Sequence, residues 1–200
     1  MILRGDQLLA FLAASSFAAG LNVYATVATL GLLARAGLLA LPPTLDPLGS
    51  WYVIAAAGAL FVIEFFADKV PGVDLVWNAL HTFVRVPVAA ILTYAATRQF
   101  SAGEQLLSAG LAALIALAAH GGKMAVRAAV TPLPEPASNM GLSAGEDAVA
   151  IGLTWVASRH PLLAATMVAF LLVITVVIVR WIWGALRALF RGAEQRLAGP

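Results

Sequence analysis

The feature that most constrains the fold is residues 7–34, a long stretch of the chain that contains no charged side chain. A second uncharged stretch, residues 162–179, contains 18 residues. A transmembrane helix needs about 20 mainly apolar residues. Composition agrees, because 62% of the residues are apolar and 11% charged, against roughly 45–50% and about 25% in soluble domains. We therefore expect residues 1–200 to form one membrane domain.

The fold class that the pattern predicts is all-α, a polytopic bundle of about six transmembrane spans. Residues 7–34 are longer than one span and contain Gly20 and Asn22, which favour helix ends, so we expect a broken or re-entrant first segment. Ser143 predicts the start of the fifth span and Glu146 completes its capping box. Three spans in each half would give an inverted 3+3 repeat. The expected spans cover residues 20–36, 48–67, 74–98, 105–127, 143–158 and 162–179, with loops at 41–47 and 71–72 and an irregular segment at 131–136.

Cations are distributed unequally between the two sides that six crossings would define. One side carries eight and the other three, so the positive-inside rule predicts that both termini are cytoplasmic and that the protein lies in a bacterial inner membrane. Residues 180–197 form a basic amphipathic extension. The N-terminus imitates a secretory signal, but Asp6 lies in its basic region, so we expect it to remain in the mature protein. The eight cations expected on the cytoplasmic side are Arg4, Lys69, Lys123, Arg127, Arg180, Arg187, Arg191 and Arg196, and the three on the other side are Arg35, Arg98 and Arg159.

Polar side chains gather where the apolar segments begin or end. Several keep helical spacing, such as Glu64 with Asp68 and His81 with Arg85, so each set lies on one helix face. A charge at the bilayer centre costs about 2.5–3.5 kcal/mol on insertion scales, which favours one polar zone between helices. The candidate pathway residues are Asn22, Tyr24, Glu64, Asp68, Lys69, Asp74, His81, Arg85, His120, Lys123, Arg127, Asn139, Glu146 and Asp147.

Two functions fit this polar zone. The leading hypothesis is a small transporter or channel-like protein that moves a small ion or solute. The alternative is a non-catalytic scaffold or accessory subunit whose buried charges neutralise one another. The sign of a substrate stays open, since helix termini favour anions and carboxylates favour cations. The partners we expect are the lipid bilayer and the small ion or solute, and a homo-oligomer is compatible with the sequence.

Other classes of function have weaker support. His81 and His120 lack the spacing of common metal motifs, so the identity of any metal is left open. An enzyme is the less favoured class because no Gly-x-Ser-x-Gly element is present. No cofactor is predicted. The arginines are spread along the chain rather than grouped in a patch, which argues against a nucleic-acid partner.

Short motifs resemble a known family. They are Gly20-Leu-Asn-Val-Tyr24, Glu64-Phe-Phe-Ala-Asp-Lys-Val-Pro71 with Asp74, Trp77 and His81-Thr82, and Pro134-Glu-Pro136 with Asn139, Ser143 and Glu146-Asp147. Over residues 18–165 the chain resembles the bacterial membrane family called domain of unknown function 4126. The resemblance implies a small multispanning protein and no established activity. The chain departs from the family pattern at Asn78, where aspartate is expected, and at Arg85-Val86-Pro87, where arginine is expected directly before proline.

Overall fold

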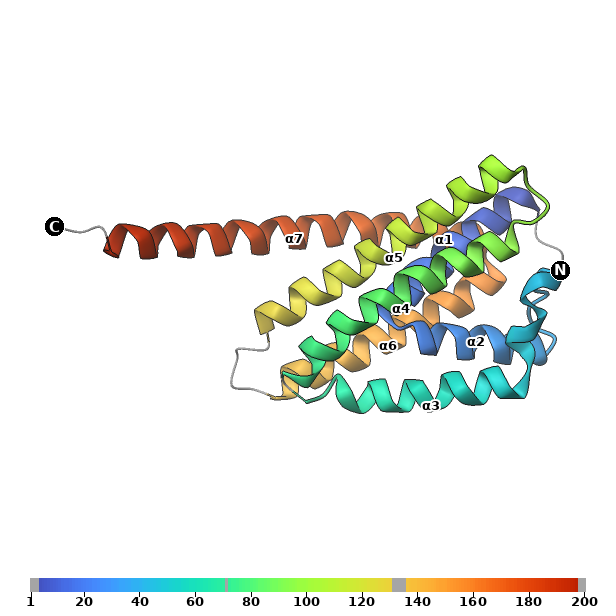
Figure 1. Cartoon of the computed structure of the whole chain (residues 1–200), viewed down its shortest axis with the longest axis horizontal. Helices are drawn as coiled ribbons and strands as arrows, with labels where there is room; N and C mark the ends of the chain where they lie inside the picture. Colours follow the sequence, from blue (N-terminus) through green and yellow to red (C-terminus); the bar gives the residue numbers. More distant parts are fainter. Residues whose placement is uncertain (1–3, 71, 131–135, 198–200) are drawn as a thin grey trace.

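The computed structural model describes residues 4–70, 72–130 and 136–197, and every regular element in them is a helix (Figure 1). The all-α prediction is therefore confirmed for this part of the chain. The elements are α1 (Gly5–Leu21), α2 (Val23–Arg35), the 3₁₀ helix η1 (Pro43–Gly49), α3 (Trp51–Ala67), α4 (Val73–Ala96), α5 (Ala102–Val130), α6 (Pro136–Arg159) and α7 (Pro161–Leu197).

The first uncharged segment is a helical hairpin that turns back inside the protein. α1 has 17 residues and α2 has 13, which gives lengths of about 25 Å and 20 Å at 1.5 Å per residue. Neither length reaches the roughly 30 Å of a bilayer core. Leu12 of α1 and Leu30 of α2 line one small cavity together with Thr93 of α4. The two helices therefore run antiparallel, and Figure 1 shows α2 returning toward the end of the bundle where α1 begins.

Asn22 explains why the hairpin breaks at this position. Its backbone is extended, with φ −150° and ψ 104°. The backbone N–H of Asn22 donates to the Ala18 carbonyl at 2.9 Å, and its side-chain oxygen accepts from the Ala25 N–H at 2.9 Å. One residue thus ends α1 and caps α2, and asparagine is among the residues most favoured for this capping role.

Fewer helices than expected have the length and composition of a span. In the described residues, three helices qualify, α4, α5 and α7, and a fourth span results if η1 and α3, which meet at a bend of 62°, are counted as one. The six crossings and the inverted repeat are not confirmed. Six crossings would also bring both chain ends to one side, whereas the first turn of α1 and the last turn of α7 lie at opposite ends of the molecule (Figure 1).

Burial is reversed relative to a soluble protein. Arg85, Arg127 and Glu64 are fully buried, while Phe83 is 82% exposed and Tyr52 is 90% exposed. α4 shows the pattern clearly, because one of its faces carries buried polar residues at helical spacing and the others carry exposed apolar ones. Apolar side chains outside and ionisable ones inside are what a helix bundle in lipid requires.

The close contact between α1 and α5 depends on a small residue, Gly20. A Cβ at Gly20 would lie 2.4 Å from the Ala116 carbonyl oxygen and 2.8 Å from the Ala119 Cβ. α1 therefore approaches the backbone of α5 as transmembrane helices with small interface residues do. This packing brings the end of α1 beside the polar residues in the second half of α5.

Two local predictions require correction. α6 begins at Pro136, so Ser143 is an interior residue of that helix and does not cap it. Proline is favoured in the first turn of a helix, which explains the earlier start. The segment expected to be irregular lies mostly in residues 131–135, outside the described residues. The second expected span begins at Trp51, as α3, rather than at residue 48. Ser50 caps this helix, because its hydroxyl accepts from the Val53 N–H at 3.3 Å.

α7 is longer than its packed part. Its 37 residues correspond to about 55 Å. Figure 1 shows its C-terminal part projecting beyond the other helices. Trp181 and Trp183 are exposed there, and the Arg187 guanidinium lies 5.2 Å from the Trp183 ring centre.

Candidate functional site: a buried charge cluster

Eight ionisable side chains from α3, α4, α5 and α6 and the turn between α3 and α4 lie together at the end of α1. We call this set the charge cluster. Its members, buried except for the partly buried Glu146, are Glu64, Asp68, Asp74, Arg85, Lys123, Arg127, Glu146 and Asp147. The structure therefore brings most of the candidate residues into one place, as the polar-zone hypothesis requires.

Glu64 is the deepest carboxylate on α3. Its Oε1 accepts from the Arg85 guanidinium in a short contact and lies 3.8 Å from the Lys123 Nζ. All three side chains are fully buried. Within the described ranges, the Oε2 atom of Glu64 and the Nε of Arg85 have no hydrogen-bond partner. Removal of one partner from such a pair would leave an uncompensated buried charge.

Asp68 contacts three polar side chains. Its Oδ2 lies 2.7 Å from the Lys123 Nζ and 3.4 Å from an Arg127 nitrogen, and its Oδ1 accepts from the Asn78 amide at 2.9 Å. Burial by itself would raise the pKa of Asp68, but the Lys123 ammonium and the Arg127 guanidinium outweigh it and hold that pKa below its usual value. Asp68 therefore stays ionised.

Arg127 joins the turn after α3 to α6. Its guanidinium contacts Glu146 at 2.6 Å, Asp74 at 3.5 Å and the Asp68 backbone carbonyl at 2.8 Å. Lys123, one turn earlier on α5, lies 3.3 Å from Glu146. The i, i+4 spacing that places these two cations on one face of α5 thus allows them to share the carboxylates of Asp68 and Glu146.

The cluster also complements the helix ends at Asn22. The carbonyl of Gly20 accepts from Arg85 at 3.4 Å and that of Leu21 accepts from Lys123 at 3.3 Å. Two cations therefore meet the negative C-terminal end of α1. At the positive N-terminal end of α2, the Asn22 amide donates to Asp147 at 2.8 Å. Charges of these signs are the ones that stabilise the respective helix ends.

The two histidines belong to separate hydrogen-bond chains. The His120 Nδ1 lies 2.8 Å from an Arg85 nitrogen and its Nε2 lies 2.8 Å from the Thr82 hydroxyl. Because arginine can only donate, that Nδ1 accepts and His120 is neutral. The His81 Nδ1 donates to the Trp77 carbonyl at 2.7 Å, and its Nε2 lies 3.0 Å from the Tyr24 hydroxyl. Tyr24 and His81 therefore border the cluster without joining its ion pairs.

Among the described side chains, the candidate cation Lys69 makes no ion pair with the cluster. Lys69 donates to the Phe65 carbonyl at 3.0 Å, and its ammonium lies 3.0 Å from the Phe65 ring centre. Asn139 lies in α6, but its side chain is outside the described residues. Asn78, Thr82 and Ser143 are cluster neighbours absent from the candidate set. Helical spacing identifies Asn78 and Thr82, since each lies four residues from another buried polar residue of α4.

The cluster contains more acid than base. Five carboxylates (Glu64, Asp68, Asp74, Glu146, Asp147) face three cations (Arg85, Lys123, Arg127), which gives the eight cluster members a formal charge of −2. Asp147 accounts for part of this excess, because it makes no ion pair with any described residue. Its Oδ2 is buried and has no hydrogen-bond partner in the part of the chain that the structure describes. The charge balance expected of a purely structural cluster is therefore incomplete.

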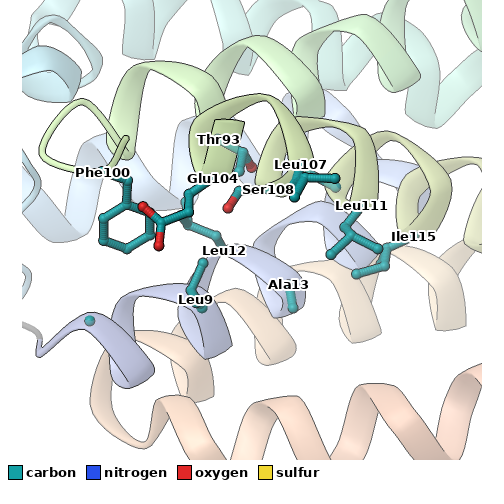
Figure 2. Close-up of a pocket in the computed structure, with 12 residues that line it drawn as sticks. Leu9, Leu12, Ala13, Thr93, Phe100, Glu104, Leu107, Ser108, Leu111 and Ile115 are labelled. Carbon is teal, nitrogen blue, oxygen red and sulfur yellow. The ribbon is translucent and has the colours of Figure 1, made fainter. Parts of the chain in front are cut away.

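An apolar groove of about 560 Å³ lies away from the cluster, between α1 and α5 (Figure 2). Leu9, Leu12, Leu107, Leu111 and Ile115 line it, and Glu104 lies near the start of α5. No member of the charge cluster lines this groove. Within the described part of the chain, no three histidine or carboxylate side chains are grouped so that they could hold a metal ion.

The fold and the inverted burial define the class of this protein. It is an α-helical membrane protein with an ionisable cluster buried between its helices. The chain belongs to the family described as "Domain of unknown function (DUF4126)", which matches residues 9–181. The predicted family is thereby confirmed. No curated protein and no solved structure matches the chain.

Proposed function

We propose that this protein is a small membrane transport protein whose pathway passes through the charge cluster at Asn22. The observation that carries the proposal is the helix break itself. Non-helical backbone at membrane depth is tolerated where it is buried in protein or lines a cavity, and transporters place substrates and coupling ions at such breaks. Here the break lies beside a buried excess of carboxylates, so the transported species is a small cation.

A structural scaffold is the second candidate, and the density of pairing favours it. Lys123 and Arg127 each contact three carboxylates. Such a network joins α3, α4, α5 and α6 without any substrate. The scaffold explains Glu64 and Asp68, whose charges are compensated. The scaffold does not explain Asp147, a buried carboxylate that makes no ion pair with any described residue. Such a carboxylate lowers stability unless another group compensates its charge.

Flux in liposomes separates the two candidates. The purified full chain is reconstituted, and uptake of sodium, of rubidium as a potassium substitute, and of protons is measured against empty liposomes. Transport predicts faster uptake of at least one of these cations, lost in Asp147→Asn and kept in Asp46→Asn, whose carboxylate is exposed. If none of the three cations enters faster than in empty liposomes, the scaffold replaces the transport proposal.

The orientation we propose follows from the cations at each end of the bundle. Seven cations lie toward the end of the bundle where α3 meets α4 and where α7 projects, and four lie at the opposite end. The positive-inside rule therefore assigns the end with seven cations to the cytoplasm of a bacterial inner membrane. The seven are Lys69, Lys123, Arg127, Arg180, Arg187, Arg191 and Arg196, and the four are Arg4, Arg35, Arg98 and Arg159.

Cysteine labelling tests this orientation, since the native chain has no cysteine. A membrane-impermeant thiol reagent should label Ala102→Cys in intact cells and Ala188→Cys only after permeabilisation. Labelling with the opposite pattern would reverse the orientation.

A further inference from the structure

Two buried oxygen atoms on one face of α6 have no hydrogen-bond partner among the residues that the structure describes. They are the hydroxyl of Ser143, which is fully buried, and the Oδ2 of Asp147, which is 5% exposed as a residue. The two residues are one helical turn apart, which places their Cβ atoms about 5–6 Å from each other on the same face. Buried polar atoms almost always have a partner, so both need an explanation.

Other hydroxyl groups in α6 do not share this property. The Thr154 hydroxyl donates to the Ala150 carbonyl at 2.7 Å, and the Ser158 hydroxyl donates to the Trp155 carbonyl at 2.6 Å. Ser143 could satisfy itself by the same kind of backbone bond and does not. Its hydroxyl oxygen therefore remains available as a ligand beside Asp147.

The surroundings decide the sign and the charge of that species. The neighbouring Oδ1 of Asp147 accepts from Asn22, and Asp147 belongs to a cluster with a formal charge of −2. An anion would add to this excess. A hard cation takes oxygen ligands such as carboxylates and hydroxyls. A single carboxylate without an ion pair balances one positive charge, which favours a monovalent ion over a divalent one.

We propose that α6 holds a monovalent alkali cation between the Asp147 Oδ2 and the Ser143 hydroxyl, beside the helix break at Asn22. This inference rests on the proposed transport function, since it identifies the class of ion that the pathway takes. Bound at this position, the ion would reduce the excess charge of the cluster.

Thermal unfolding of the purified full chain in detergent tests the site without any flux measurement. The Tm is measured in sodium chloride and in potassium chloride, each against choline chloride at equal ionic strength and pH. At ten times the dissociation constant, we expect one alkali cation to raise the Tm by about 3–6 °C for a chain of this size. Asp147→Asn and Ser143→Ala should each lose this increase. Ser158→Ala is the matched control, because its hydroxyl has a backbone partner, and it should keep the increase.

The outcomes separate this inference from the proposed function. A Tm that is equal in all three salts would overturn the site and leave a bound water as the partner of the two oxygens. An increase that persists in both Asp147→Asn and Ser143→Ala would place the cation elsewhere and would also overturn it. Cation-dependent melting without flux in liposomes would keep the cation site and refute transport. Flux without cation-dependent melting would keep transport and refute the cation site.

Discussion

Replacement of Glu64 by glutamine should destabilise the protein strongly, because it removes the carboxylate that compensates Arg85. Both side chains are fully buried, and the other contacts of the Arg85 guanidinium are a neutral imidazole and a backbone carbonyl. Breaking a buried pair by removing one partner costs about 3–5 kcal/mol. For a chain of 200 residues, this corresponds to a fall in Tm of about 6–20 °C. Thermal unfolding in detergent, followed by circular dichroism, measures it.

A double variant provides the test of the physical reason. Glu64→Leu combined with Arg85→Met removes both charges, and replacement of a buried pair by apolar residues is often neutral. The double variant should therefore be more stable than Glu64→Gln. Asp46→Asn, an exposed carboxylate, is the control and should leave the Tm unchanged. If Glu64→Gln melts like the unmutated protein, Arg85 does not depend on Glu64 and the assignment of a buried ion pair is wrong.

Three further changes test the rest of the cluster and the hairpin. Asn22→Ala removes the cap of α2 and the amide donor of Asp147, so it should lower the free energy of unfolding by about 1–3 kcal/mol in a denaturant titration. Gly20→Val forces α1 away from Ala116 and should cost about 1–3 kcal/mol, while Gly110→Ala, with open space around its Cβ position, should cost little. The pKa of Asp68 is lowered in the folded protein, so its ionised carboxylate stabilises the fold at a pH above its unfolded pKa of about 4. This stabilisation is lost as the pH falls further, so the Tm should drop at acidic pH and should drop less in Asp68→Asn.

The sequence predicts those parts of this fold that depend on composition and local signals. Uncharged stretches identify the helices, and Gly20 with Asn22 identifies the break, because glycine and asparagine act locally at helix ends. Helical spacing correctly placed His81 and Arg85 on one face of α4. The start of α6 was predicted wrongly, since Ser143 and Glu146 match a capping box although Glu146 binds Arg127 from another helix.

The number of spans and the partners within the cluster are not encoded locally. Residues 7–34 are long enough for one span, and only packing against α5 and α6 decides that they form a hairpin instead. Lys69 contacts the Phe65 ring one helical turn earlier, although its charge and position in the sequence suggest a cluster cation. Pairings such as Asn22 with Asp147 join residues far apart in the chain, so a single sequence gives no signal for them.

The account depends most directly on the hairpin formed by α1 and α2, because the break and its charge cluster exist only if the chain turns back at Asn22. The decisive measurement is the accessibility of single cysteines at Gly5 and Ala36, which are exposed residues at the start of α1 and just after α2. A membrane-impermeant thiol reagent applied to intact cells should label both variants or neither, since both positions lie on the same side of the membrane. Labelling of one position in intact cells and of the other only after permeabilisation would show that the segment crosses the bilayer, and it would contradict the hairpin.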